Sequence, residues 1–335
     1  MKIVIFEVET WEREAFAGLG HAHDIVYLAT PLTADNAADF ADADIVSTFI
    51  YSDLGRPVLE QFADLKLVAT RSTGFDHIAL DCCDERGIRV ANVPDYGANT
   101  VAEHVFALLS AISHRMIDAV DRTRRGDFSQ QGLQGFDLMG KTLGVIGTGH
   151  IGAHAARIAR GYDMQVVAFD LHPDADLAAR TGFRYVGMDE LLATSDIVTL
   201  HVPANARTHH LISADAFAKM KDGVGLINTA RGDVVDVEAL LQALASGKVA
   251  AAGLDVLPEE PAVREEAELL RTWFQRKYNL ETLLADHILL RLKNVIITPH
   301  SAFNTREAVG RILATTHDNI AGFLAGAPVN IVNDG

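Results

Sequence analysis

The chain has 335 residues, of which 49% are hydrophobic and 22% are charged, and its formal net charge is −16. This length predicts two domains, and the composition is ordinary for a globular protein. The acidic charge balance argues against nucleic acid and against an anionic membrane surface as partners. No apolar run approaches the roughly 18 residues of a membrane span, and residues 1–8, interrupted by Glu7, favour a first strand over a signal peptide.

Cys82 and Cys83 are the only cysteines in the sequence, and they are adjacent. A disulfide between neighbouring residues is strained, and this spacing provides no metal-ligand pattern. We therefore expect no metal site, and we expect two free thiols in a reducing cytoplasm.

The first hundred residues alternate between strands and helices. Short branched apolar runs predict five strands, at residues 2–8, 24–29, 45–50, 65–71 and 89–93. Helices are expected between them at 35–43 and 57–62. This alternation predicts a parallel sheet that is covered on both faces.

A long apolar helix is expected next, at residues 101–116, after an Asn99-Thr100 capping signal. A polar stretch at 122–134 then precedes a second series of strands, at 142–146, 165–170, 197–202, 224–229, 250–256 and 295–298. A last helix at 306–324 follows the final strand and can return to the first sheet. The sequence thus predicts an α/β fold with two doubly wound parallel-sheet domains.

Residues 260–292 interrupt this rhythm with a charged and apolar helical insertion, at 263–278 and 280–292. Long insertions after the carboxyl end of a strand often act as lids or interface elements. A solvated loop explains the segment equally well, so both interpretations stay open.

A glycine-rich turn at residues 147–152 lies between the strand at 142–146 and a helical segment at 151–160. Gly147 allows a tight turn, Gly149 allows a pyrophosphate to approach the backbone, and Gly152 allows helix and strand to pack closely. The N–H groups near His150 and Ile151 begin the helix and can bind phosphates. Strand, glycine turn and helix in this order predict a dinucleotide-binding site.

Asp170 stands at the end of the following strand, 18 residues after Gly152. A carboxylate at this place can accept hydrogen bonds from both ribose hydroxyls of NAD, and it repels the 2′-phosphate of NADP. The expected cofactor is therefore NAD.

Three further polar residues follow strands of the second series: Arg231, Glu260 and His300. Ligands of open α/β sheets bind beyond the carboxyl ends of the strands, so these side chains are candidates for one site. A guanidinium can bind a carboxylate and polarise the adjacent carbonyl. An imidazole can transfer a proton, and a carboxylate beside it orients it. Together the three residue types suit hydride transfer to a 2-oxo acid.

At these residues the chain resembles the D-isomer-specific 2-hydroxyacid dehydrogenase family, and most of all its D-lactate dehydrogenase branch. The resemblance extends over nearly the whole chain. Its motifs are the segments 71–77, 93–96, 101–104, 147–152, 200–203, 228–232, 253–256 and 298–303. It implies a Rossmann-type NAD-binding domain at residues 100–300, inserted into a flavodoxin-like substrate domain at 1–99 and 301–335.

The resemblance also implies which residues are catalytic. The family's arginine and histidine fall on Arg231 and His300, and its glutamate lies five residues after Asp255. That count reaches Glu260 and not its neighbour Glu259.

Residues for the cofactor and the substrate follow from the same resemblance. Those placed around NAD are Asp255, Thr229, Ala230, Val202 and Pro203, the last two on the adenine side. Those placed around the substrate are Thr73, Gly74, Tyr96, Phe303 and Tyr51. The N–H groups of Thr73 and Gly74 would hold the substrate carboxylate. The three rings would shape a small apolar pocket, although core packing explains Tyr51 equally well.

The sequence therefore predicts an NAD-dependent oxidoreductase that reduces a small 2-oxo acid to its D-2-hydroxy acid, with pyruvate and D-lactate as the leading pair. Leu257 stands where many relatives carry an aromatic residue, which leaves 2-hydroxyisocaproate, glyoxylate and hydroxypyruvate as alternatives. A non-catalytic, NAD(H)-sensing binding protein of the same fold is the alternative from another class. Because relatives dimerise through the cofactor domain, the helix at 101–116 predicts a homodimer.

Overall fold

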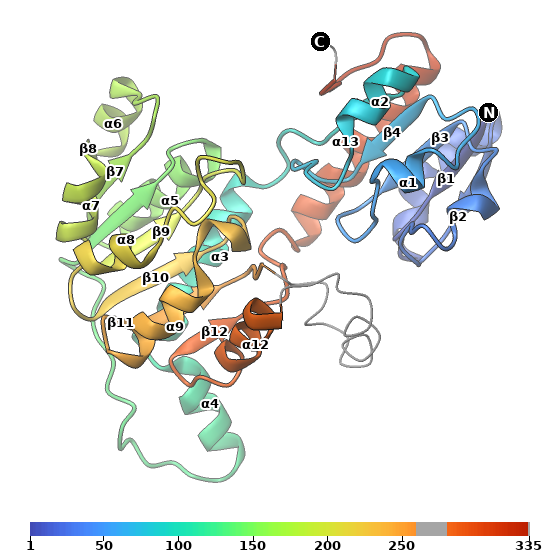
Figure 1. Ribbon diagram of the computed structural model, residues 1–335. Coiled ribbons are helices and arrows are strands. Elements are labelled where there is room, and N and C mark those ends of the chain that lie inside the picture. Colours follow the sequence, from blue (N-terminus) through green and yellow to red (C-terminus); the bar gives the residue numbers. More distant parts are fainter. Residues whose placement is uncertain (259–279, 334–335) are drawn as a thin grey trace. The chain divides into compact units, whose positions relative to one another are not determined.

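The computed structural model describes residues 1–258 and 280–333. The chain forms two compact units, which are coloured along the sequence in Figure 1. Unit 1 comprises Met1–Gly97 and Asn304–Gly335, and unit 2 comprises Ala98–Phe303. Each unit contains one parallel sheet, which confirms the predicted α/β fold class.

The sheet of unit 1 has five strands in the order β2-β1-β3-β4-β5, all parallel. This is the flavodoxin-like order of a doubly wound sheet. The strands are β1 (Lys2–Ile5), β2 (Asp24–Tyr27), β3 (Ile45–Thr48), β4 (Leu67–Thr70) and β5 (Arg89–Ala91). They are apolar because both faces are covered, and β3 and β4 are buried along their whole length.

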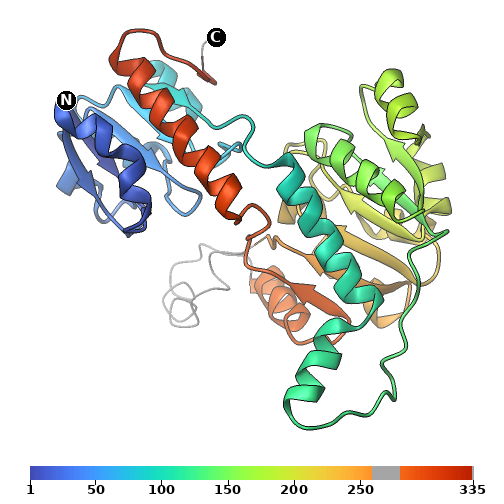
Figure 2. The ribbon, with the colours of Figure 1, turned by 180° about the vertical axis from the view of Figure 1, so that it is seen from behind.

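Helices pack on both faces of this sheet. They are η1 (Glu12–His21), η2 (Ala37–Phe40), α1 (Arg56–Leu59), α2 (Leu80–Arg86) and α13 (Arg306–Leu324). The C-terminal helix α13 lies against β4 and η1, as Figure 2 shows from behind. It begins where predicted, because the Thr305 side chain accepts a hydrogen bond from the N–H of Ala308 at 3.2 Å.

All seven elements predicted within the first hundred residues are shorter in the structure, and two of them show why. The helix expected at 35–43 is only the 3₁₀ turn η2, because the Asn36 side chain bonds the Thr33 N–H and the Pro31 carbonyl and so stabilises a local turn. The strand expected at 2–8 ends at Ile5, because Glu7 has a φ of 53° and interrupts the extended chain.

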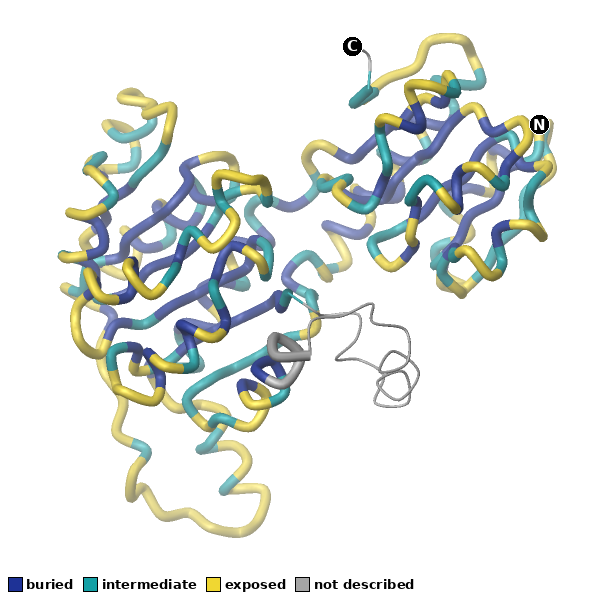
Figure 3. The backbone as a smooth tube through the Cα atoms, in the orientation of Figure 1, coloured by how far each residue is buried: buried dark blue, intermediate teal, exposed yellow. Residues whose placement is uncertain are grey.

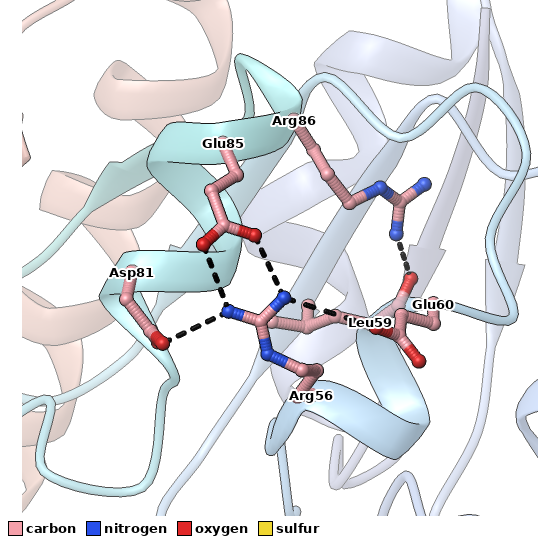
Figure 4. A network of polar contacts seen from close by, with 6 residues as sticks. All are labelled: Arg56, Leu59, Glu60, Asp81, Glu85 and Arg86. Atoms are coloured by element: carbon pink, nitrogen blue, oxygen red, sulfur yellow. Dashed lines mark hydrogen bonds and ion pairs between the residues drawn. The ribbon is translucent and has the colours of Figure 1, made fainter.

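Polar contacts join α1 to α2, as Figure 4 shows from close by. Arg56 on α1 bonds Asp81 at 2.9 Å and Glu85 at 2.7 Å, both on α2. Arg86 donates in return to the carbonyl oxygens of Leu59 and Phe62. Since such exposed ion pairs contribute little to stability, these contacts mainly fix the orientation of the two short helices.

The sheet of unit 2 has seven parallel strands in the order β12-β11-β10-β9-β6-β7-β8. Six of them were predicted. The strands are β6 (Thr142–Ile146), β7 (Gln165–Phe169), β8 (Arg184–Tyr185), β9 (Ile197–Leu200), β10 (Val224–Asn228), β11 (Val249–Leu254) and β12 (Val295–Ile297). Counted from β6, this is the Rossmann order with one further strand at its edge. The additional element is β8, whose two residues are too few for a sequence pattern.

The helices of unit 2 form a layer on each face of its sheet. One layer contains α3 (Ala98–Ser113) and α5 (His150–Gly161). The other contains α7 (Met188–Thr194), α8 (Ala214–Lys219), α9 (Val237–Ala245) and α12 (Leu280–Leu289). Among the residues of unit 2 that the structure describes, the other helices are α4 (Met116–Arg124), α6 (Ala175–Thr181) and η3 (Gly232–Val234). Within the described residues, no helix is both long enough and apolar enough to cross a membrane.

The long helix α3 differs from its prediction at both ends. It begins at Ala98, so Asn99 and Thr100 lie in its first turn and are not its cap. It ends at Ser113, and Arg115, with a φ of 48°, separates it from α4. The apolar side chains of α3 pack into the core of unit 2, which accounts for its composition.

Exposed apolar side chains instead follow α3, on α4 and on the loop that leads to β6. Figure 3 shows this stretch as mostly exposed. The residues concerned are Met116, Ile117, Val120, Phe128, Phe136 and Met139, and the exposed fraction of Phe128 is 80%. Such a concentration of exposed apolar groups is typical of an interaction surface.

Candidate active site

Six strands of unit 2 end in register. Cα pairing joins their last residues, which are Ile297, Leu254, Asn228, Leu200, Ile146 and Phe169. The residues that follow these ends therefore form one row along the carboxyl edge of the sheet: Thr298, Asp255, Thr229, His201, Gly147 and Asp170. This edge is where ligands of open α/β sheets bind, and most of the predicted site residues of unit 2 lie in the row or within three residues of it.

Asp255 is the central acceptor of the row, and its exposed fraction is only 1%. Its carboxylate accepts the Thr298 hydroxyl at 2.5 Å and the N–H groups of Ser301 and Ala302 at 2.9 Å. Burial raises the pKa of this carboxyl, but the hydrogen bonds, including one from His104, outweigh burial and hold the pKa below its usual value. Asp255 is therefore ionised and fixes the turn that follows β12.

His300 lies in that turn with a left-handed backbone. Its φ is 50°, a conformation that costs a residue with a side chain about 1 kcal/mol or more. Its N–H donates to the carbonyl oxygens of Asp255 and Thr298, both at 2.9 Å. These bonds and the Asp255 carboxylate hold the backbone of His300 in place.

Arg231 follows β10 by three residues, on a loop that Asn228 organises. The buried Asn228 side chain accepts the Ala230 N–H at 3.0 Å and donates to the Arg231 carbonyl at 2.9 Å. The Arg231 guanidinium donates to the Ala230 carbonyl at 2.8 Å and is only half-buried. The backbone is thus fixed, and a guanidinium with its five N–H donors is a group suited to binding an anion.

The next residue, Gly232, brings this loop against the segment that leads toward Glu260. A Cβ at Gly232 would lie 2.2 Å from the carbonyl carbon of Leu257, so only glycine permits the approach. Glu260 itself, and most of the predicted insertion, lie outside the described residues. The later part of that insertion is helical, as predicted, in α12.

The glycine turn joins β6 to α5, with Gly149 as the N-terminal cap residue and His150 and Ile151 as the first helical residues. Gly147 has a φ of 90°, and a Cβ there would lie 2.4 Å from the His201 carbonyl oxygen. A Cβ at Gly149 would meet no atom within 4 Å, so the protein itself does not require glycine at that position. The open space beside the backbone of Gly149 leaves room for a pyrophosphate to approach it.

Asp170 follows β7 and turns its carboxylate toward the glycine turn. Its Oδ2 accepts the N–H of Thr148 at 2.6 Å and the Thr148 hydroxyl at 2.9 Å, and its Oδ1 accepts the N–H of His172 at 2.9 Å. Burial raises the pKa of Asp170, but these bonds outweigh it and lower the pKa overall. The group is therefore a fixed negative charge beside the turn.

The remaining residues expected around NAD line the same edge. Thr229 and Ala230 are buried, and the Thr229 hydroxyl has no hydrogen-bond partner among the described residues. Val202 is half-buried and Pro203 is exposed. A buried hydroxyl without a protein partner and a bare glycine turn are the features that a bound dinucleotide would satisfy. The residues present therefore fit NAD.

In unit 1, the turn after β4 carries Thr73 and Gly74. The Thr73 hydroxyl donates to the Val93 carbonyl at 2.7 Å, and the Thr73 carbonyl accepts the Asn92 side chain at 2.8 Å. The Ser72 hydroxyl donates to the Gly74 carbonyl at 2.6 Å. The Thr73 side chain and the carbonyl groups of Thr73 and Gly74 are thus hydrogen-bonded within unit 1, which fixes the backbone of the turn.

Tyr51 follows β3 on a loop that Glu7 holds. The Glu7 carboxylate accepts the N–H groups of Phe49 and Tyr51, each at 2.8 Å, and the Ser52 hydroxyl. Tyr51 is 47% exposed, which excludes the core-packing interpretation of its ring. Its ring meets that of Phe49 edge to face, with 6.0 Å between the centroids.

The two other predicted aromatic residues are half-buried. In unit 1, the Tyr96 carbonyl accepts a hydrogen bond from Arg311 on α13. In unit 2, Phe303 directly follows Ala302, whose N–H bonds Asp255.

Four residues that connect the predicted ones were not singled out from the sequence: His104, Thr148, Tyr185 and Asn228. His104 lies in the motif at 101–104, and its Nε2 is 3.0 Å from the Thr298 hydroxyl. Thr148 and Asn228 also lie within motifs, so their positions were marked although their bonds were not. Tyr185 lies in the short strand β8, and no sequence signal marked it.

The sequence and the structure of this chain are similar to those of known dehydrogenases. A family model described as D-isomer specific 2-hydroxyacid dehydrogenase, NAD binding domain, matches residues 106–302. The D-lactate dehydrogenase of Escherichia coli (strain K12) is 34% identical over 333 residues, which cover 97% of this chain and 98% of that protein.

Solved structures are similar over the same extent. The D-lactate dehydrogenase of Aquifex aeolicus, complexed with NAD and lactic acid, is 35% identical with a TM-score of 0.88, and 99% of both chains is covered. A D-2-hydroxyisocaproate dehydrogenase is 27% identical with a TM-score of 0.80, covering 99% of this chain and 100% of the other. The likeness therefore extends over both units.

Proposed function

This chain belongs to the D-isomer-specific 2-hydroxyacid dehydrogenase family, and we propose that the reaction it catalyses is the reduction of pyruvate to D-lactate. The chain is an NAD-dependent dehydrogenase of D-2-hydroxy acids. The alternative of a non-catalytic NAD(H)-sensing protein therefore no longer applies. The specific substrate is the proposal.

One observation supports the catalytic assignment most. Strand β11 lies between β10 and β12 in the sheet. Asp255 follows β11, Arg231 follows β10 and His300 follows β12. Asp255 binds the turn of His300 through both its carboxylate and its carbonyl oxygen. The proposed proton donor, His300, and the proposed anion-binding group, Arg231, therefore follow the two strands on either side of the strand that precedes the ionised Asp255.

In the proposed reaction, bound NADH supplies the hydride that reduces the carbonyl carbon. Arg231 binds the substrate carboxylate and polarises the carbonyl, since its planar group offers two parallel donors. His300 donates the proton that converts the carbonyl oxygen into the hydroxyl, and Glu260 orients His300. In the reverse direction His300 accepts that proton.

The substrate assignment draws on unit 1 as well. The braced turn at Thr73 and Gly74 offers N–H groups to a carboxylate. As the family resemblance implies, we propose Tyr51, Tyr96 and Phe303 as the rings that limit the size of the group attached to the substrate's C2, which favours a methyl group over a branched chain. The likeness to lactate-acting relatives along both units supports the same choice. Hydroxypyruvate, glyoxylate and 2-oxoisocaproate are the alternatives.

A substrate panel tests this proposal. We expect kcat/KM with NADH to be higher for pyruvate than for hydroxypyruvate, glyoxylate or 2-oxoisocaproate. Since one methylene in an apolar pocket corresponds to about 1–3 kcal/mol, the preference should be graded. Phe303→Ala should move the preference toward 2-oxoisocaproate, and Trp11→Ala, at an aromatic residue that is 60% exposed, is the control. A wild-type preference for 2-oxoisocaproate would overturn the lactate assignment.

We further propose that the chain forms a homodimer. The apolar content of α3 does not support this, because α3 packs within unit 2. The exposed apolar groups of α4 and the following loop support it instead, since monomers rarely expose so many together. A second copy is the partner we propose, because twofold homodimers are the commonest assemblies.

A cytoplasmic location is also part of the proposal. Cys82 and Cys83 are free and buried on α2. Burial raises the pKa of the Cys83 thiol to about 12, which disfavours the reactive thiolate. Unpaired structural thiols are typical of proteins from reducing compartments. Cell fractionation with an antibody against the chain tests the location.

A further inference from the structure

Three side chains of unit 2 form a chain of hydrogen bonds behind the candidate ribose site. The Tyr185 hydroxyl lies 2.8 Å from the Thr148 hydroxyl, which lies 2.9 Å from Oδ2 of Asp170. The three residues come from the edge strand β8, the glycine turn and the end of β7. None of the roles given above explains Tyr185.

The direction of these bonds follows from the chemistry of the groups. The ionised Asp170 carboxylate can only accept, so the single proton of the Thr148 hydroxyl is donated to it. The Thr148 oxygen must then accept from its other neighbour, and Tyr185 is the donor. The series of hydrogen bonds therefore runs from Tyr185 through Thr148 to Asp170, and each bond polarises the next.

Tyr185 is itself held in position by the sheet. Strand β8 pairs with β7, and Tyr185 lies opposite Ala168, two residues before Asp170. The Tyr185 ring meets the buried Phe183 ring edge to face, with 5.1 Å between the centroids. The donor at the start of the chain is thus fixed by backbone pairing and by ring packing.

These hydrogen bonds hold the Asp170 carboxylate in one orientation. Thr148 binds Oδ2 twice, through its N–H and its hydroxyl, while His172 binds Oδ1. These bonds take three of the about four lone-pair positions of a carboxylate, and the position that remains is on Oδ1. A ribose hydroxyl can take that position, whereas a 2′-phosphate there meets a negative charge that cannot turn away.

We propose that Thr148 and Tyr185 are positioning residues that set the preference for NADH over NADPH by fixing the Asp170 carboxylate. The inference rests on the proposed contact between Asp170 and the ribose. Removing the Thr148 hydroxyl leaves Oδ2 with the Thr148 N–H as its remaining bond, so the carboxylate is held less firmly. Its bond to a ribose hydroxyl then weakens, and its repulsion of a 2′-phosphate is relieved. Removing the Tyr185 hydroxyl leaves the Thr148 bond in place and acts less strongly.

Equilibrium binding of NADH and NADPH to the full chain, without substrate, tests the proposal by calorimetry. The quantity compared is the Kd for NADPH divided by the Kd for NADH, which measures the preference for NADH. A hydrogen bond to a charged group corresponds to roughly a tenfold change or more, so Thr148→Val should reduce the ratio about tenfold. Tyr185→Phe should reduce it about threefold, as expected for loss of a neutral bond. Thr148→Ser, which keeps the hydroxyl, should retain the wild-type ratio within about twofold.

Matched variants separate this effect from a general loss of structure. Thr194→Val removes a hydroxyl that bonds the Glu190 carbonyl on α7, and Tyr162→Phe removes the hydroxyl of a tyrosine of unit 2 that is 42% exposed. Both should keep the wild-type ratio. In addition, the pKa of the Asp170 carboxyl, followed by NMR, should rise in Thr148→Val, because one bond that lowers it is lost.

Asp170→Ala distinguishes the ways in which the proposal can fail. If Asp170→Ala lowers the Kd ratio while Thr148→Val and Tyr185→Phe leave it unchanged, the positioning role is overturned although Asp170 still selects the cofactor. If Asp170→Ala also leaves the ratio unchanged, the ribose contact itself is wrong. Neither outcome depends on whether pyruvate is the substrate, which the substrate panel decides separately.

Discussion

The N–H of His300 donates to the carbonyl oxygen of Asp255 at 2.9 Å, and the Asp255 carboxylate accepts the N–H groups of the two residues that follow His300. One buried, ionised residue thus holds three successive amides. The left-handed backbone of His300, with its φ of 50°, is stable because these bonds determine it. His300 is the proposed proton donor, and a donor whose backbone is fixed in this way needs little reorganisation when it acts.

Replacing His300 by alanine should remove most of the turnover and leave NADH binding intact. The side chain is the proposed proton donor, and loss of such a group lowers rates by about 10²–10⁴-fold. Steady-state assays with pyruvate and fluorescence titration with NADH measure the two effects. His21→Ala, at an exposed histidine of unit 1, is the control. Turnover close to wild type in His300→Ala would show that another group supplies the proton.

Arg231→Lys should not behave as a conservative change. Lysine keeps the charge but lacks the planar pair of donors that matches a carboxylate and its neighbouring carbonyl. We expect kcat to fall and the KM for pyruvate to rise, with a combined loss of more than about 100-fold in kcat/KM. Arg180→Lys, on the exposed face of α6, should leave both constants unchanged. Wild-type kinetics in Arg231→Lys would mean that the arginine has only a structural role.

His201 should make the folded chain sensitive to mild acid. Burial lowers the pKa of His201 to about 4, whereas an unfolded histidine has a pKa of about 6.5. Between these values only the unfolded chain binds the proton, so the free energy of unfolding falls as the pH falls through this window. His201→Gln lacks this proton uptake and should lose stability less steeply, by up to about 1.4 kcal/mol per pH unit.

Urea unfolding at several pH values between 4 and 6.5 measures that difference in slope. Glutamine keeps a group that can bond the Thr199 hydroxyl, which is 3.0 Å from Nε2 of His201. His21→Gln, at an exposed residue, should keep the wild-type slope. Parallel curves for His201→Gln and the wild type would contradict the prediction.

The homodimer should depend on the exposed apolar groups that follow α3. Light scattering at micromolar concentration should report about twice the mass of one chain for the wild type. Ile117→Glu and Phe128→Asp place charges on side chains that are 58% and 80% exposed, so they should dissociate the dimer without unfolding the monomer. Leu290→Glu, at a similarly exposed residue outside this stretch, is the control. A wild-type monomer would rule out this assembly.

The sequence was sufficient for most of the fold because buried parallel strands are continuous apolar runs. Strand β6 and helix α13 have the predicted bounds, since their ends are marked by the glycine turn and by the Thr305 cap. Two-residue β8 could not be predicted, because its pairing depends on β7 and not on its own composition. The end of β1 depends on the positive φ of Glu7, which local propensity does not favour.

The positions of the candidate residues at the strand ends could be predicted from the sequence, but the hydrogen bonds between them could not. Motifs marked Arg231, Asp255 and His300, because chemistry at strand ends is visible in a sequence. The bonds that join these residues cross between strands that are distant in sequence. The hydrogen bonds from Tyr185 to Asp170, for example, form because β8 pairs with β7, and the sequence does not show that pairing.

The most direct test of the proposed function is the product formed from pyruvate and NADH. The purified chain is incubated with both until NADH absorbance no longer falls, and lactate is then resolved by chiral chromatography. We expect D-lactate in an amount equal to the NADH consumed, and about 10²–10⁴-fold slower formation of D-lactate in His300→Ala. Formation of L-lactate, or consumption of NADH without lactate, would contradict it.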